Sequence, residues 1–272
     1  MPSWTVDAPK RLDFDDVTAL NVRLMAGSVA VLASDDPPSL VVTELKGRPL
    51  QVTQEGGELT ISYESLSWEG LLGFLKPRHD SAAVTITVPA DCPIQLGVLS
   101  ASAIVCGLRS GAAVKGMSGD VTLDGVAGNV EAETMSGEIA ARDIDGEVRF
   151  KSMSGGLVLA DGWLDRLEAN TMSGQIAADV TLRAEGDVHV STMSGDVTLR
   201  LPEGSDARVR LKSTSGAVRS EFESLRAVKA PASHTVSGNV GAGTGRVSVS
   251  TMSGSVTLLR RLRREGKESE TR

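Results

Sequence analysis

Apolar and polar residues alternate with a period of two along most of the second half of the chain. Apolar or small residues occupy every other position in short runs such as 130–134, 148–152 and 167–171. A period of two places alternate side chains on opposite faces of a β-strand, so each run predicts a strand with one buried face. The first hundred residues repeat this alternation more weakly. We therefore expect an all-β chain.

A Ser-Gly pair follows these runs and divides the chain into repeats of 16–22 residues. The inward parity shifts across each pair, which predicts that the chain turns a corner there. Glycine supplies a backbone conformation closed to other residues, and the serine hydroxyl can hydrogen-bond the turn. The predicted corners are Ser118-Gly119, Ser136-Gly137, Ser154-Gly155, Ser173-Gly174, Ser194-Gly195, Ser215-Gly216, Ser237-Gly238 and Ser253-Gly254.

Repeats of this length are typical of the coils of a solenoid. A single coil cannot bury its own apolar face, so successive coils stack and bury it together. We expect a single-stranded right-handed β-helix of about 18–22 residues per coil, with Ser136, Ser154 and Ser173 one above another. Residues 1–97 would form an irregular N-terminal β cap with an apolar insertion at 64–80. Residues 98–258 would form the regular solenoid, and 259–272 a basic flexible tail.

The outward positions offer an independent check on this stacking. One predicted column reads Glu131, Arg149, Glu168, His189 and Arg210, so like charges do not fall on successive repeats. Parallel coils in register need such an order, because equal positions lie about 4.8 Å apart.

Composition and charge limit the classes of function that the chain can have. The chain carries a net charge of -7 and has no basic stripe interleaved with stacking aromatics, which disfavours nucleic acid as a partner. No run of about 18 apolar residues predicts a membrane span, and the N-terminus lacks a basic region followed by an apolar run. We expect a cytoplasmic protein, with peripheral contact to the inner membrane left open.

Catalytic and metal-binding patterns are weak. The chain has three histidines, and none is placed by a recognisable motif as a base for a corner serine. The residues after the corners are too mixed to serve as calcium ligands, and Cys92 and Cys106 lack a metal-binding spacing. We therefore predict no enzymatic activity and no cofactor or metal.

Methionines precede six of the corners. Their regular placement leaves two interpretations open: an exposed ridge of flexible apolar side chains suited to a partner, or side chains tucked into the corners. The candidate methionine ridge comprises Met117, Met135, Met153, Met172, Met193 and Met252.

Two further segments are candidate contacts for a partner or an anionic membrane. The insertion at 64–80 interrupts the strand pattern, and it either caps the open end of the solenoid or binds something. The basic tail either holds lipid headgroups or is a solvated terminus. The candidate contact residues are Trp68, Leu71, Leu72, Phe74, Arg260, Arg261, Arg263 and Arg264.

The chain resembles a known family. Val88-Pro89-Ala90, the run 98–102 and units such as 192–197 (Thr-Met-Ser-Gly-Asp-Val) resemble the Toastrack family of bacterial adhesin-like β-repeat domains. The resemblance implies a right-handed β-helix and a bacterial source. For some members it also implies envelope-stress signalling and membrane-anchored partner domains. The absence of a predicted membrane span is a departure from many members.

Three functional hypotheses follow. The leading one is a non-enzymatic structural or interaction module, with an unidentified protein partner, that docks at the inner face of the membrane. The second is a carbohydrate-binding or carbohydrate-cleaving solenoid, which needs exposed aromatics such as Trp163 and Phe150 beside an acidic cleft. The third is self-assembly into filaments through open strand edges.

Overall fold

The computed structural model describes residues 2–63, 80–230 and 233–262. These residues form β-strands joined by turns, and they include no helix long and apolar enough to cross a membrane. The strands are β1 (Ser3–Val6), β2 (Lys10–Asp13), β3 (Ala19–Ala33), β4 (Ser39–Lys46), β5 (Leu50–Glu55), β6 (Glu58–Tyr63), β7 (Ser81–Val88), β8 (Ile94–Cys106), β9 (Ala112–Gly116), β10 (Val121–Thr134), β11 (Ile139–Ser152), β12 (Leu157–Thr171), β13 (Ile176–Thr192), β14 (Val197–Pro202), β15 (Ala207–Ser213), β16 (Val218–Ser220), β17 (Arg226–Ala230), β18 (Ser233–Val240), β19 (Gly245–Thr251) and β20 (Val256–Arg261).

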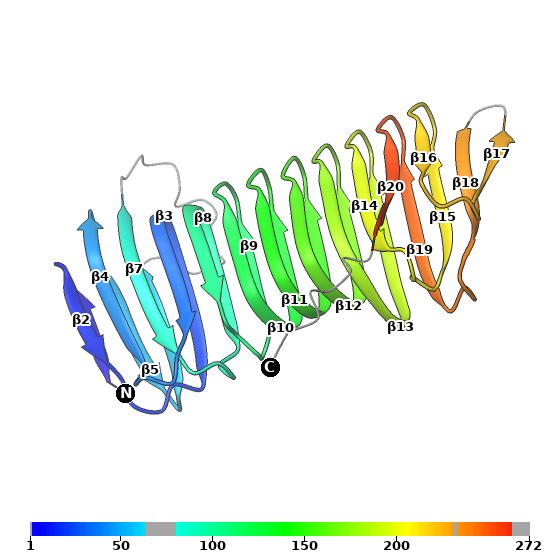
Figure 1. The fold of residues 1–272 in the computed structure, drawn as a ribbon. Coiled ribbons are helices and arrows are strands. Elements are labelled where there is room, and N and C mark those ends of the chain that lie inside the picture. The colour runs from blue at the N-terminus through cyan, green and yellow to red at the C-terminus, as the bar shows by residue number, and fades with distance from the viewer. Residues whose placement is uncertain (1, 64–79, 231–232, 263–272) are drawn as a thin grey trace, which may run out of the picture.

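The strands stack into an elongated, two-layered body (Figure 1). Each of β10, β11, β12 and β13 spans almost a whole repeat and bends in its middle, so that its two halves lie in different layers. We call the half that leads into a Ser-Gly corner the pre-corner layer, as at 130–134, and the half that leaves it the post-corner layer, as at 121–124. The expected all-β, repeat-based architecture is confirmed.

The central coils stack in parallel and in register. Val121 of β10 pairs with Ile139 of β11, and Thr134 pairs with Ser152 at the other end of the same strands. The outward column also follows the prediction here, since Glu131 pairs with Arg149 and Arg149 with Glu168.

The last repeat lies out of chain order. β19 and β20 lie between the coil of β13 and β14 and the coil of β15 and β16, because β19 pairs with both β13 and β15 and β20 with both β14 and β16. The expectation that successive repeats are successive coils is therefore wrong at this end. Ser248 separates His189 from Arg210, which the sequence had placed next to each other.

The predicted corner at Ser237-Gly238 is also wrong. Both residues lie within β18, which runs antiparallel to β15 and places them opposite Arg210 and Val209. The chain reaches β18 through a hairpin from β17, so it enters the layer from the opposite direction. A strand in that direction closes the stack and does not form another coil.

The N-terminal part also contains parallel strands that pair out of chain order. β3 pairs in parallel with β8 from Leu20 to Leu32, although more than 60 residues separate their partners along the chain. The intervening strands β4 to β7 lie on its other side, and β1 and β2 add antiparallel strands to β5 and β4.

Short strands form the edges at both ends. β1 and β2 have four residues each, β16 has three and β17 has five. Short edges offer few unpaired backbone groups to a second copy, which is how many β-proteins limit edge-to-edge association.

The core lies between the two layers and consists mainly of Val, Leu, Ile and Ala. Phe150 and Tyr63 are among its few large aromatic side chains, and both are fully buried. Burial and the charge of Asp80 raise the pKa of Tyr63 to about 12. Aliphatic side chains fill the narrow interlayer space, which accounts for the scarcity of aromatics in the sequence.

Glycine is required at the corners because consecutive corners approach each other closely. A Cβ added to Gly174 would overlap the backbone carbonyl of Gly155, and one added to Gly195 would overlap that of Gly174. Among the corner pairs that stack, φ lies in the left-handed region only at Gly119. The predicted reason, a special backbone conformation, is therefore replaced at most corners by lack of space.

A buried carboxylate fixes the inserted C-terminal strand. Asp179 of β13 accepts hydrogen bonds from Arg200 Nε of β14 at 2.8 Å and from Arg261 Nη1 of β20 at 2.7 Å. Arg261 Nη2 also donates to Thr181 Oγ1 at 2.6 Å. Hydrogen bonding to Asp179 raises the pKa of Arg200. Three strands are joined at one carboxylate, which links the last repeat to its neighbours.

Replacing a corner glycine tests the steric account. Gly174→Ala should lower the free energy of unfolding by about 1–3 kcal/mol, as overpacking of a close-packed interior does. Gly204→Ala is the matched control, because nothing lies within 4 Å of its added Cβ. Guanidinium unfolding curves compare the two, and an equal effect of both substitutions would contradict the account.

Removing the charge of Asp179 tests the strand clamp. Asp179→Asn should cost about 2 kcal/mol, the scale of hydrogen bonds to a charged group, and should speed amide hydrogen exchange in β20. Glu203→Gln is the control, because its partner Arg260 and Glu203 itself are both about half exposed. The clamp is rejected if the exchange of β20 amides responds equally to both variants.

Candidate interaction surface

Hydroxyl groups fix the backbone at each stacked corner. The amide N–H of Gly174 donates to Thr171 Oγ1 at 3.0 Å, and that of Gly195 donates to Thr192 Oγ1 at 2.9 Å. The corner serines donate in turn to the coil before them, as Ser154 Oγ does to the Met135 carbonyl at 3.1 Å. These hydroxyls are engaged in structural hydrogen bonds, which satisfy backbone groups of the turn.

The candidate methionine ridge is exposed. Its members follow one another along a long edge of the molecule, since Ser136 N donates to the Met117 carbonyl and Ser253 N to the Met193 carbonyl. The interpretation in which these side chains tuck into the corners does not hold. The exposed fractions are 46% for Met117, 47% for Met135, 51% for Met153, 51% for Met172, 50% for Met193 and 56% for Met252.

A groove of about 620 Å³ runs beside this ridge on the pre-corner layer; we call it the methionine groove. Met172, Met193 and Met252 form one wall. Its floor is a row of equivalent outward positions on five neighbouring strands, which the strand registers place side by side. That row is Lys151, Asn170, Ser191, Ser250 and Lys212.

The methionine groove is uncharged in its middle and cationic at its ends. Lys151 is paired with Glu133 at 3.6 Å, whereas Lys212 has no ion pair with any residue in the described part of the chain. Five strands at about 4.8 Å span roughly 19 Å from the first lysine to the last. The groove therefore offers amide and hydroxyl groups along a line, with a free ammonium group at one end.

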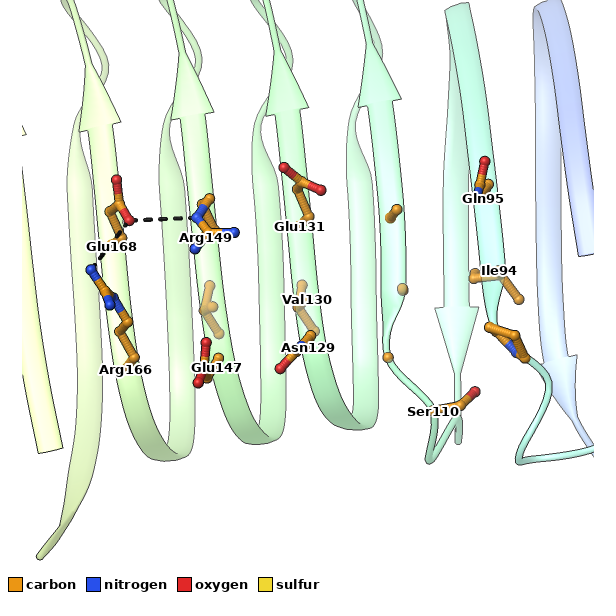
Figure 2. A pocket seen from close by; sticks show the side chains of 15 residues that line it. Ile94, Gln95, Ser110, Asn129, Val130, Glu131, Glu147, Arg149, Arg166 and Glu168 are labelled. Carbon is orange, nitrogen blue, oxygen red and sulfur yellow. Dashed lines mark hydrogen bonds and ion pairs between the residues drawn. The ribbon is translucent and has the colours of Figure 1, made fainter. Parts of the chain in front are cut away.

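A second, smaller groove of about 300 Å³ lies nearer the opposite bends of the same layer (Figure 2). Glu131, Glu147 and Glu168 line it together with Arg149 and Arg166. Glu168 is held between the two arginines, at 3.4 Å from Arg149 Nε and 3.7 Å from Arg166 Nη2. Ion pairing between exposed side chains explains this cluster.

The post-corner layer differs in its outward residues. Its first outward column crosses neighbouring strands without a charged residue from β7 to β20. Ile104 and Val158 are its most exposed large members, at 45% and 44%. The column is Thr85, Ala30, Ile104, Thr122, Ala140, Val158, Ala177, Thr198 and Thr257.

Of the predicted membrane contacts, only Arg260 and Arg261 lie in the part of the chain that the structure describes. Trp68, Leu71, Leu72 and Phe74 lie outside the described residues, as do Arg263 and Arg264. Arg260 and Arg261 close the last strand and are engaged within the chain, with Glu203 at 3.1 Å and with Asp179.

The two aromatics that the carbohydrate hypothesis needs are separated by burial. Phe150 is in the core, whereas Trp163 is 57% exposed. Trp163 pairs with Asp145 and Thr181 near the bends opposite the methionine ridge. It is not among the residues lining the methionine groove or the glutamate-lined groove.

The two cysteines and the acidic and histidine side chains were the remaining candidates for reactivity or metal binding. Burial raises the pKa of the Cys92 thiol to about 11 and also raises that of Cys106, so neither is activated as a thiolate. Within the described residues, no three His, Cys, Asp or Glu side chains form a metal-binding group.

The methionine groove was not predicted from the sequence. The missing element was Ser250, which belongs to the inserted strand β19. The repeat of Thr-Met-Ser-Gly at 251–254, closer to the central units than the intervening 214–216 and 236–238, was the available signal.

Several proteins of solved structure match the chain. A candidate cell adhesion protein from Clostridium sporogenes is 12% identical, with 93% of this chain and 100% of that chain covered and a TM-score of 0.24. A candidate lipid-binding protein from Parabacteroides distasonis is 18% identical, with 93% and 97% covered and a TM-score of 0.47. A candidate adhesin from Bacteroides fragilis is 11% identical, with 95% and 97% covered and a TM-score of 0.39.

No curated protein matches the chain. The family model described as Toastrack DUF4097 matches residues 17–259, which include β3 to β19 complete and most of β20. The resemblance noted at Val88-Pro89-Ala90 and at the Ser-Gly units thus extends over nearly all of the stacked strands, and the chain belongs to the Toastrack DUF4097 family.

Proposed function

We propose that this chain is a non-enzymatic, adhesin-like interaction module that binds an extended partner in the methionine groove. The observation that carries the proposal is the alignment of five equivalent outward positions beside a wall of exposed methionines. Such a site is linear, and it lies on a scaffold whose backbone is held by strand pairing on both sides.

The chemistry of the groove indicates the kind of partner. Asn170, Ser191 and Ser250 can donate and accept hydrogen bonds along the floor, and flexible thioethers can follow an irregular apolar edge. The unpaired ammonium of Lys212 favours an anionic group at that end. An extended segment of another protein with a polar edge, an apolar edge and an acidic residue fits these features.

Site-specific crosslinking tests the groove. A photoreactive side chain at Ser191 should give a discrete crosslinked product in bacterial cells that produce the full chain, and Lys212→Glu should reduce its yield. The same group at Thr122, in the post-corner layer, is the control. Products of equal yield from both positions, or no reduction by Lys212→Glu, would contradict the assignment of the site.

The finer geometry of the scaffold is part of the proposal. Val121 pairs with Ile139, 18 residues later, and this offset supports coils of about 18–22 residues. A right-handed winding agrees with the strong preference for right-handed parallel crossovers.

Peripheral docking at an anionic membrane, linked to envelope-stress signalling, is a second proposal. One observation favours it: Leu262 is 64% exposed where the described chain ends, directly before Arg263 and Arg264. Because Arg260 and Arg261 are engaged within the chain, Arg263 and Arg264 would supply the positive charges of this surface. The apolar residues at 68–74 would supply its apolar contacts. Its location would then be cytoplasmic, at the inner face of the membrane.

Liposome flotation measures this second proposal. The full chain should float with vesicles containing anionic lipid and should be released as salt rises, since each basic residue contributes about 1 kcal/mol near such a surface. Arg263→Glu with Arg264→Glu should abolish flotation. Glu265→Ala is the control, and equal flotation of all three proteins would reject the role of the tail.

A further inference from the structure

The corner position that holds the ridge does not require methionine. Leu99 and Thr214 occupy equivalent places, since Ser118 N donates to the Leu99 carbonyl and Thr214 N to the Thr251 carbonyl. Both coils turn the corner with these residues. The backbone geometry of the corner therefore does not explain why the six consecutive positions between them all hold methionine.

The backbone holds the six methionines at a fixed spacing. Each of their carbonyl oxygens accepts a hydrogen bond from the serine N–H of the following coil at 2.9–3.0 Å. Neighbouring coils are about 4.8 Å apart, and a methionine side chain has three rotatable bonds before its terminal methyl group. Thioether sulfurs of adjacent coils can thus converge on a single atom between them without any movement of the backbone.

We propose that the methionine ridge binds a soft monovalent metal cation, Cu(I), through thioether sulfurs of successive coils. Thioethers are soft ligands that select Cu(I) over hard cations. The ligands are uncharged and half exposed, so the ion does not have to enter the core. This proposal is independent of the partner proposed for the groove.

The charges beside the ridge favour one end for the first ion. Asp120 and Glu138 are exposed and lie directly after the corners of Met117 and Met135. Glu133, on the other side, is paired with Lys115 at 3.3 Å as well as with Lys151. Near Met193 and Met252 only the corner of Met193 is followed by an acid, the exposed Asp196, and the unpaired Lys212 lies in the groove beside these methionines. A cation is attracted to the acidic end within a Debye length of about 8 Å.

Methionine-to-leucine substitution separates metal binding from apolar contact. Leucine keeps the volume and apolar character of the side chain but has no sulfur. The ridge methionines can therefore be replaced in two matched sets: Met117, Met135 and Met153 at the acidic end, and Met172, Met193 and Met252 at the groove end.

Silver(I), a redox-inert stand-in for Cu(I), is the probe. It is titrated in chloride-free buffer into the full chain carrying Cys92→Ala and Cys106→Ala, which removes competing thiols, with 13C-labelled methionine methyl groups read by NMR. Met25, which is partly buried and accepts a hydrogen bond from Arg48 Nη2 at 3.3 Å, is the internal control. We expect the ridge methyl signals to shift at a few equivalents while the Met25 signal stays.

The two leucine sets decide the outcome. The acidic-end set should remove the shifts seen at the lowest silver concentration, whereas the groove-end set should leave them. Competition with a Cu(I) chelator under ascorbate should give the same order. Ridge signals that shift no more than that of Met25 would overturn the proposal, and equal loss with both sets would overturn the preferred end.

Discussion

The approach of one corner glycine to the next is the constraint on which the rest of the molecule depends. The carbonyl of Gly155 occupies the space that a Cβ of Gly174 would need, and the same contact recurs from Gly174 to Gly195 and from Gly195 to Gly254. Because a larger residue cannot enter, the coils superimpose at this edge. The hydroxyls of Thr171 and its equivalents then complete the hydrogen bonds of the turn.

Superimposed corners convert a sequence repeat into columns of like position. Inside, the columns are aliphatic and close the space between the two layers. Outside, the side chains of each column lie next to one another on neighbouring strands, so their charges must be compatible. Glu131, Arg149 and Glu168 alternate in charge, and two of them pair at 3.4 Å. A column of one charge would be repelled at a spacing of about 4.8 Å.

The central coils were predictable because two signals coincide there: the period of two and the Ser-Gly pair. The position of β19 and β20 was not, since local pattern carries no information about which neighbour a strand selects. At Ser237-Gly238 the local pattern matched a corner, yet the hairpin from β17 reversed the strand. Tertiary pairing overrode the motif. The same limit hid the methionine groove, whose floor needs Ser250 of the inserted strand.

The insertion of the last repeat also explains why the ridge is continuous. In chain order, Thr214 and Val236 would follow Met193 and interrupt the series of methionines. In the structure Met252 follows Met193, and Thr214 comes only after it. Asp179, by joining β13, β14 and β20, secures this order from the other layer. A buried carboxylate in one layer thus helps to hold the strand order that brings these side chains together along the exposed edge, although it never touches a ligand bound there.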